Sequence, residues 1–226
     1  YQLMRDFVPV APLNASDLVL AARASLPART LAEVLKAARD KPDGMTYASS
    51  GPGTPYHLAG ELLKHLAGVR IVHVPYKGSA GARTDLLGGQ VDLMFDNITS
   101  VIGQARAGSV KALGITSLKR TALAPEFAPV ADTVPGYETT SWSGVAVRAG
   151  TPKEICDKIE ADTRKFCQEP AVREKLAPLV AEPVGSSAAN GPPSSYCTHS
   201  SIASMGVLSG TSTTALTSMR MASPLG

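Results

Sequence analysis

The chain has 226 residues, with 44% hydrophobic and 18% charged side chains and a formal net charge of +3. This length corresponds to one large domain or two small ones at about 100–200 residues per domain. The weak positive charge and the 5% content of aromatic residues argue against a protein that binds nucleic acid, because such proteins concentrate lysine, arginine and stacking side chains. No apolar run approaches the roughly 18 residues of a membrane-spanning helix, so we expect no membrane insertion.

The chain shows no pattern typical of a metal or cofactor site. Its three cysteines are too few for a disulfide framework. Cys156 and Cys167 fall on one predicted helix and are separated by roughly 16 Å at about 1.5 Å per residue, too far for a disulfide or a shared metal. The four histidines lie on different elements without ligand spacing. The dinucleotide fingerprint and the P-loop are both incomplete, so we expect neither a metal nor a cofactor.

The predicted elements begin with a strand at 7–10 and continue with a helix from residue 31. Thr30 and Glu33 form a capping box at the start of this helix. A second helix begins after Thr54 as N-cap, with Pro55 in its first turn, and ends at Gly68. Further strands are predicted at 45–49, 71–74, 91–95, 111–115 and 143–147, and further helices at 79–88, 98–107, 152–168 and 170–177.

Short strands alternate with helices from about residue 45 to residue 115. Such alternation predicts an α/β fold with a mostly parallel sheet flanked by helices. In sheets of this kind, ligands bind outside the carboxyl ends of the strands. The loops that follow the strands at 45–49, 71–74 and 91–95 are therefore candidate binding segments.

The first of these loops combines hydroxyl side chains, glycines and the start of a helix. Free backbone N–H groups and the positive end of the helix dipole attract anions. The same residues are equally compatible with a tight glycine turn and an N-cap that bind no ligand. The candidate anion-binding residues of this loop are Ser49, Ser50, Gly51, Gly53, Thr54 and His57.

The next two loops offer fewer groups. Lys77 supplies a cation and Tyr76 an amphipathic wall, although a solvated lysine on a turn explains Lys77 as well. Asp96 and Asn97 follow the strand at 91–95 and are candidates either for ligand contact or for capping the next helix.

The sequence gives little support to catalysis. Ser49 and Ser50 lack the G-x-S-x-G context of a nucleophile elbow. His57 follows Ser50 closely, but no acid is evidently spaced to orient its ring. A hydrolase or phosphate-ester enzyme that uses Ser50 and His57 remains the alternative from another function class.

Five segments carry a resemblance to a known family. They are residues 47–61 (YASSGPGTPYHLAGE), 73–78 (HVPYKG), 85–92 (DLLGGQVD), 95–96 (FD) and 134–137 (VPGY). In this order they resemble the Bug-type extracytoplasmic solute receptors, the binding component of tripartite tricarboxylate transporters. The resemblance covers about residues 1–185.

The resemblance implies a periplasmic, non-enzymatic binding protein with two α/β lobes of the type II periplasmic-binding-protein kind. Such receptors bind a small carboxylate between the lobes and work with the membrane subunits of the transporter. By resemblance, the loop from Ser49 to Thr54, with His57, helps to hold the carboxylate, and the segments from Tyr76 to Gly78 and from Asp96 to Asn97 line the same cleft. A sensory or partner-binding module without a transport role is a further alternative.

The family pattern also suggests a division of the chain. Residues 1–13 correspond to a remnant of the first lobe or hinge crossing, 14–140 to the second lobe, and 141–185 to a return strand and helices of the first lobe. We expect this chain to lack the signal peptide of intact relatives and most of the first lobe. We therefore expect weak ligand binding and exposed apolar surface on the helix at 152–168.

Residues 186–226 differ from the rest of the chain. They contain no Asp, Glu or Lys and keep no regular hydrophobic period, which predicts a polar, disordered tail. The segment from Asn190 to Ser194 can be encoded so that the neighbouring frame reads Glu-Trp-Ala-Ala-Phe, which resembles the family's C-terminal helix. We therefore hypothesise that the tail is a frameshift product, a question that the nucleotide sequence decides.

Overall fold

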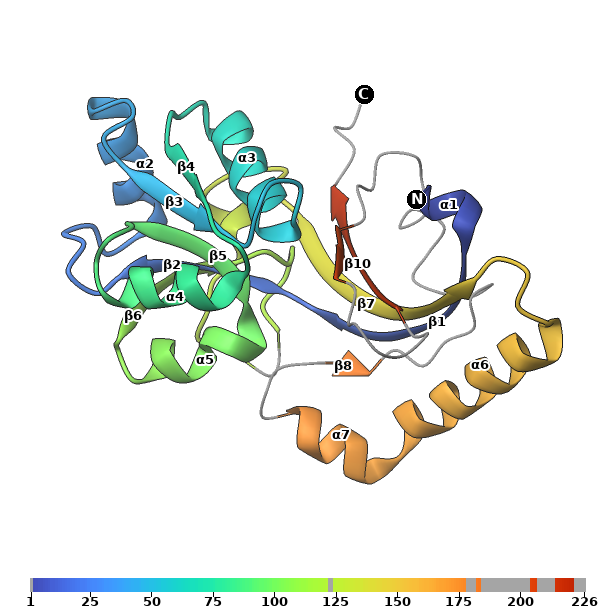
Figure 1. The fold of residues 1–226 in the computed structure, drawn as a ribbon. Helices are drawn as coiled ribbons and strands as arrows, with labels where there is room; N and C mark the ends of the chain where they lie inside the picture. Colours follow the sequence, from blue (N-terminus) through green and yellow to red (C-terminus); the bar gives the residue numbers. More distant parts are fainter. Residues whose placement is uncertain (1, 122–123, 178–181, 184–203, 207–213, 222–226) are drawn as a thin grey trace. The chain divides into compact units, whose positions relative to one another are not determined.

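The computed structural model describes residues 2–121, 124–177, 182–183, 204–206 and 214–221 (Figure 1). The chain forms two compact units, one built mainly from residues 17–140 and the other from the segments before and after them. None of the described helices is long and apolar enough to cross a membrane.

The unit of residues 17–140 contains a five-stranded sheet with the strand order β4-β3-β5-β2-β6. β3 pairs in parallel with β4 and with β5, whereas β2 is antiparallel to β5 and to β6. All strands except β2 therefore share one direction, and the predicted α/β fold with a mostly parallel sheet is confirmed. The strands are β2 (Leu18–Arg23), β3 (Thr46–Ser49), β4 (Val72–Pro75), β5 (Leu93–Asn97) and β6 (Val110–Ile115).

The sequence patterns did not indicate β2. Every residue from Leu18 to Ala22 is completely buried, so the strand is a continuous apolar run without the alternation of a half-exposed strand. Periodicity cannot distinguish such a run from a piece of buried helix. The strand lies between β5 and β6, where both of its faces and both of its edges are covered.

Four helices pack around this sheet (Figure 1). The predicted caps form: the Thr30 side chain accepts from the Glu33 amide, and Thr54 accepts from the His57 amide. Gly68 ends its helix in the left-handed conformation, with φ of 61°, which a glycine adopts without strain. The helices are α2 (Leu31–Asp40), α3 (Pro55–Ala67), α4 (Ser79–Leu87) and α5 (Ile98–Arg106).

The chain after β6 returns to the core of this unit through the short 3-10 helix η1 (Val130–Asp132). Tyr137 is completely buried there, and its hydroxyl donates to the Ala59 carbonyl of α3 at 3.0 Å. Its ring stacks on Phe95 of β5, with centroids 6.1 Å apart. The VPGY segment thus fixes α3 against the strand whose end carries Asp96.

The other unit is built on β1 (Phe7–Ser16), which is antiparallel to β7 (Thr139–Arg148). α6 (Lys153–Gln168) packs on these strands through Cys156 and Ile159, whereas Ile155 and Phe166 are 51% and 54% exposed. Exposed apolar side chains on this helix were expected. The unit also contains α1 (Leu3–Asp6), α7 (Pro170–Leu176) and β8 (Glu182–Pro183).

The tail differs from its prediction in two places. The structure describes strands β9 (Ser204–Gly206) and β10 (Thr214–Met221), which pair in antiparallel fashion in a segment predicted to be disordered. β10 contains two threonines, which are β-branched and favour strands, although its hydrophobic pattern is weak. The rest of the predicted tail lies outside the described residues.

Candidate functional site

The three predicted binding loops meet at one edge of the sheet. β3, β4 and β5 are parallel neighbours, so their carboxyl ends lie on the same side. Backbone hydrogen bonds join the first two loops directly: the Tyr76 amide donates to the Ser49 carbonyl at 3.0 Å, and the Gly78 amide to the Ser50 carbonyl at 3.2 Å. The structure therefore brings the candidate residues of these loops together.

Protein groups already satisfy several amides of the β3–α3 loop. The Gly51 amide donates to the Ser49 hydroxyl at 3.1 Å, and the Gly53 amide donates to the His57 ring at 3.0 Å. The Thr54 amide donates to the Gly51 carbonyl at 3.3 Å. Gly51 and Gly53 have φ values of 131° and 76°, which only glycine adopts readily. These residues shape the turn but do not offer free donors.

Two amides of this segment remain available. Within the described residues, neither the Ser50 amide nor the Tyr56 amide donates a hydrogen bond to a protein group, and Pro52 and Pro55 have no N–H group. Ser50 and Tyr56 are both partly exposed. The predicted set of anion donors is thus smaller than the sequence suggested, and Tyr56 was not among the predicted residues.

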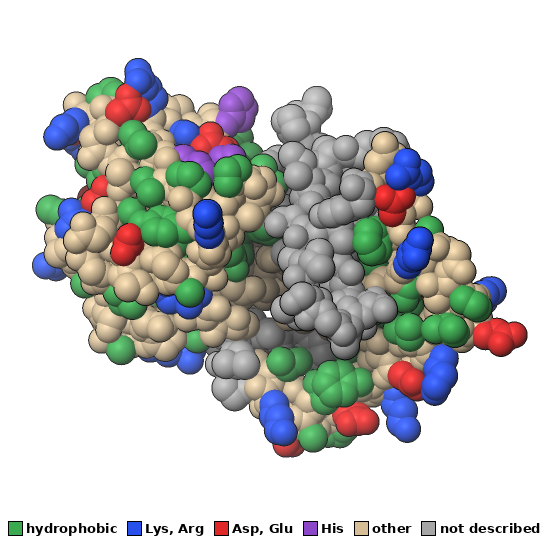
Figure 2. All heavy atoms as spheres, viewed as in Figure 1, with side chains coloured by type: hydrophobic (Ala, Val, Ile, Leu, Met, Phe, Trp, Pro, Cys, Tyr) green, Lys and Arg blue, Asp and Glu red, His purple; other side chains and the backbone are tan. Residues whose placement is uncertain are grey.

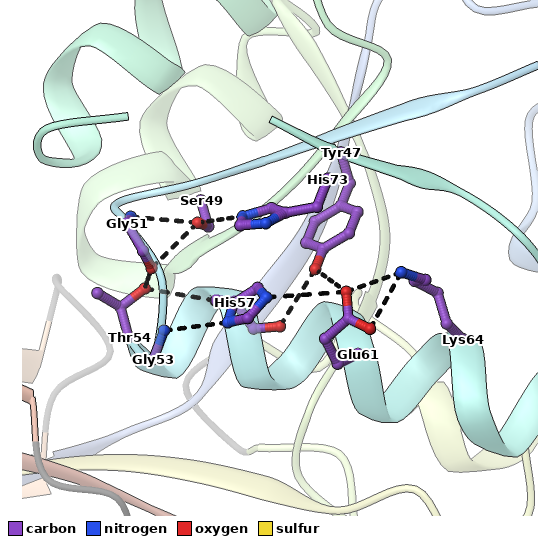
Figure 3. A network of polar contacts seen from close by, with 9 residues as sticks. All are labelled: Tyr47, Ser49, Gly51, Gly53, Thr54, His57, Glu61, Lys64 and His73. Carbon is purple, nitrogen blue, oxygen red and sulfur yellow. Dashed lines mark hydrogen bonds and ion pairs between the residues drawn. The ribbon is translucent and has the colours of Figure 1, made fainter. Parts of the chain in front are cut away.

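A network of polar and stacking contacts extends from this loop along α3 (Figure 3). The Ser49 hydroxyl lies 2.7 Å from His73 Nε2, and Ser49 is completely buried. The His73 ring stacks on both the His57 ring and the Tyr47 ring, with centroids 4.2 Å and 4.8 Å apart. His73 comes from β4, so these contacts join two parallel strands to α3 next to the candidate site.

Glu61 of α3 contacts three polar side chains of this network, those of Tyr47, Lys64 and His57. It accepts from the Tyr47 hydroxyl at 2.5 Å and from Lys64 at 2.8 and 3.0 Å. Its Oε1 lies 3.8 Å from His57 Nε2. Burial acts against ionisation, but the hydrogen bonds from Lys64 and Tyr47 outweigh it and lower the pKa of Glu61. The expectation that no acid is spaced to orient His57 is therefore wrong, because residues four apart share one face of a helix.

Asp96 is completely buried at the end of β5 and is not free to meet a ligand. Arg83 of α4 donates to one of its oxygens at 2.7 Å, and the Asn97 amide donates to the other at 2.8 Å. Burial raises the pKa of Asp96, and the hydrogen bond from Arg83 opposes that rise. Burial and the nearby Asp96 charge raise the pKa of Tyr56 to about 12. The Arg83–Asp96 pair was not foreseen.

The remaining predicted residues differ in their surroundings. The Asn97 side chain caps α5 by accepting from the Thr99 amide at 3.2 Å, as one of the two interpretations of this residue proposed. The Tyr76 hydroxyl donates to Asp85 at 2.6 Å. Lys77 is exposed, and Gly78 has φ of 110° at the start of α4.

Figure 2 shows histidine, acidic and basic side chains reaching the surface of this unit beside one another. The His57 and Glu61 side chains are 23% and 41% exposed, so solvent reaches the upper part of the network. Among the described residues, no group of three His, Cys, Asp or Glu side chains is arranged to hold a metal ion.

An α/β unit with uncommitted donors at the carboxyl ends of adjacent strands has the architecture of a ligand-binding protein. The chain matches the sequence model of the tripartite tricarboxylate transporter family receptors over residues 1–191. It therefore belongs to this family, and the resemblance to Bug-type receptors is confirmed. The structures that it resembles include a periplasmic binding protein, BugD, at 32% identity and a TM-score of 0.75, covering 80% of this chain and 61% of BugD.

Other relatives share a similar degree of likeness. A protein encoded in the tcbD-tcbE intergenic region of Pseudomonas sp. strain P51 is 41% identical over 79% of this chain. The R. palustris protein Rpa4515, solved with adipate, is 36% identical with a TM-score of 0.79, covering 83% of this chain and 63% of that one. MatC from Rhodopseudomonas palustris, solved with bound malate, is 32% identical with a TM-score of 0.75, covering 80% and 62%. The chain spans about half the length of most of the curated relatives it matches, 54% in the case of the protein from Pseudomonas sp. strain P51.

Proposed function

We propose that the unit of residues 17–140 supplies one side of a binding site for a small carboxylate, in a periplasmic solute receptor that serves a tripartite tricarboxylate transporter. The observation that carries this proposal is a pair of uncommitted amides: that of Ser50, directly after β3, and that of Tyr56, in the first turn of α3. Family membership and relatives solved with adipate and malate support it.

The proposal divides the candidate residues into two groups. The Ser50 and Tyr56 amides, the Ser50 hydroxyl and the exposed Lys77 contact the carboxylate, and each good charge-assisted hydrogen bond contributes about 1.5–3 kcal/mol. The second group supports the site without contacting the ligand, and Tyr76 and Thr54 lie next to this group. It consists of Ser49, Gly51, Gly53, His57, Gly78, Asp96 and Asn97.

The proposed receptor acts without catalysis and without a cofactor. In the alternative hydrolase, His57 would take a proton from Ser50. However, His57 Nδ1 accepts from the Gly53 amide and Nε2 faces Glu61, so neither ring nitrogen is free for that proton. The histidine that lies near a serine is His73, and its partner Ser49 is completely buried. A carboxylate receptor fits these contacts better.

Saturation-transfer NMR with adipate and malate tests the proposal, because it detects weak binding. As a matched ligand control, 1,6-hexanediol keeps the length of adipate without its charges. We expect transfer to adipate or malate and none to the diol. Lys77→Gln should weaken binding about twofold to fivefold, the contribution of an exposed charge, whereas Lys36→Gln on α2 should not. Equal transfer to the diol, or none to any carboxylate, would contradict the proposal.

A further inference from the structure

His57 lies at the centre of the network, and both of its ring nitrogens face protein groups (Figure 3). Nδ1 accepts from the Gly53 amide at 3.0 Å, and Nε2 lies 3.8 Å from a Glu61 oxygen. A ring nitrogen accepts a hydrogen bond only when it carries no proton. The geometry therefore corresponds to a neutral ring whose single proton is on Nε2 and points toward Glu61.

The bond between Gly53 and His57 joins the loop to the first turn of α3. Gly53 lies between the two uncommitted donors in the chain, Ser50 before it and Tyr56 after it. A second contact, from the Thr54 hydroxyl to the Gly51 carbonyl at 2.7 Å, closes the same turn. The imidazole thus holds the segment that presents the donors through its Nδ1 atom, while its Nε2 atom faces Glu61.

We propose that His57 is a positioning residue: its neutral ring holds the Gly53 amide in place, and protonation of the ring releases the loop and weakens ligand binding. The effect on the ligand rests on the proposed function. A proton added at Nδ1 would face the Gly53 N–H, so two donors would meet where a hydrogen bond existed. Histidine is the side chain that changes charge between about pH 5 and 8, so the loop becomes sensitive to acidification.

The groups around His57 favour a single protonation event. The His57 ring stacks on the His73 ring of β4. The other titratable or charged groups next to these two rings are Glu61 and Lys64 of α3 and Tyr47 of β3. Burial, and then the neighbouring His57, lower the pKa of His73, whereas Glu61 opposes this shift. The two rings are stacked with centroids 4.2 Å apart, so a charge on one disfavours a charge on the other.

The sign of the pH dependence separates positioning from direct contact. If His57 touched the carboxylate, its protonation would add a positive charge at the ligand and affinity would rise in acid. If it positions Gly53, affinity falls in acid. If the side chain had only a structural role, the Gly53 amide resonance would not change with pH. Replacing His57 by a residue that does not titrate would then remove no pH dependence.

The test follows the Gly53 amide resonance by NMR from pH 5 to 8, together with adipate affinity. His57→Asn keeps an acceptor near the Nδ1 position without a titrating ring, and His65→Asn, exposed on the same helix, is the matched control. We expect the Gly53 resonance to titrate in the wild type and in His65→Asn but not in His57→Asn. Adipate affinity should fall about tenfold from pH 7.5 to 5.5 in the wild type, equivalent to about 1.4 kcal/mol, and less than twofold in His57→Asn.

Three results would overturn the inference: a Gly53 resonance that does not titrate, a titration that persists in His57→Asn, or an affinity that rises in acid. His57→Gln replaces His57→Asn if the latter does not fold. Absence of adipate and malate binding at every pH refutes the proposed function instead. In that case the Gly53 resonance alone decides whether His57 holds the loop.

Discussion

Gly60 allows the sharpest test of the packing beneath the site. A Cβ atom at this position of α3 would lie 2.2, 2.6 and 2.8 Å from three atoms of the Tyr47 ring. The ring has little room to move, because it stacks on His73 and its hydroxyl donates to Glu61 at 2.5 Å. Gly60→Ala therefore forces either the helix or the ring out of place.

Two opposing contributions decide the sign of the effect. Alanine favours a helix over glycine by about 0.5–1 kcal/mol, whereas overpacking a well-packed core costs about 1–3 kcal/mol. Because all three close contacts are with ring atoms of a buried side chain, we expect overpacking to dominate. The free energy of unfolding of this unit should fall by about 1–2 kcal/mol.

Gly103 of α5 is the matched control, because a Cβ there would meet no atom within 4 Å. Gly103→Ala should raise the free energy of unfolding by about 0.5–1 kcal/mol. Urea unfolding, followed through amide resonances of β3 and α3, measures both variants. The packing argument is refuted if Gly60→Ala is as stable as the wild type, or if both substitutions change stability in the same direction.

Three further changes test other parts of the unit. Arg83→Met leaves the buried Asp96 carboxylate without its cation and should lower the free energy of unfolding in urea by about 3–5 kcal/mol. Adding Asp96→Asn should restore part of the lost free energy. A double mutant no more stable than Arg83→Met would contradict the pairing. The lowered pKa of His73 means that the unfolded chain binds its proton more readily, so stability should be lost as pH falls from about 6.5 toward the lower folded value. His73→Gln should flatten that part of the stability profile, and an unchanged profile would count against the shift. Tyr137→Phe removes the donor to the Ala59 carbonyl and should lower the free energy of unfolding by about 0.5–1.5 kcal/mol. An unchanged free energy of unfolding would argue against this hydrogen bond.

Most of the fold could be predicted from local patterns, because the strands and helices of residues 30–115 carry caps, turns and apolar stripes of their own. β2 could not, since Leu18–Arg23 is stabilised by its neighbours on both edges and has no alternating pattern. Its position between β5 and β6 depends on contacts distant in sequence.

The candidate site shows the same limit. Sequence spacing located the three loops, because the carboxyl ends of parallel strands define one edge. It did not reveal which donors remain free, since the Gly51 and Gly53 amides donate to side chains of β3 and α3. Glu61 was within reach of a spacing argument, being four residues after His57. The Arg83–Asp96 pair could not be predicted from spacing, because Arg83 lies on α4 and Asp96 on β5.

In the proposed receptor, the Ser50 amide after β3 and the Tyr56 amide in the first turn of α3 bind the carboxylate. Amide NMR shifts of the unligated chain during a titration with adipate test it most directly, with 1,6-hexanediol as the parallel titration. We expect saturable shifts that are largest at the Ser50 and Tyr56 amides and absent with the diol. Saturable shifts confined to other parts of the chain, with both of these amides unmoved, would contradict it.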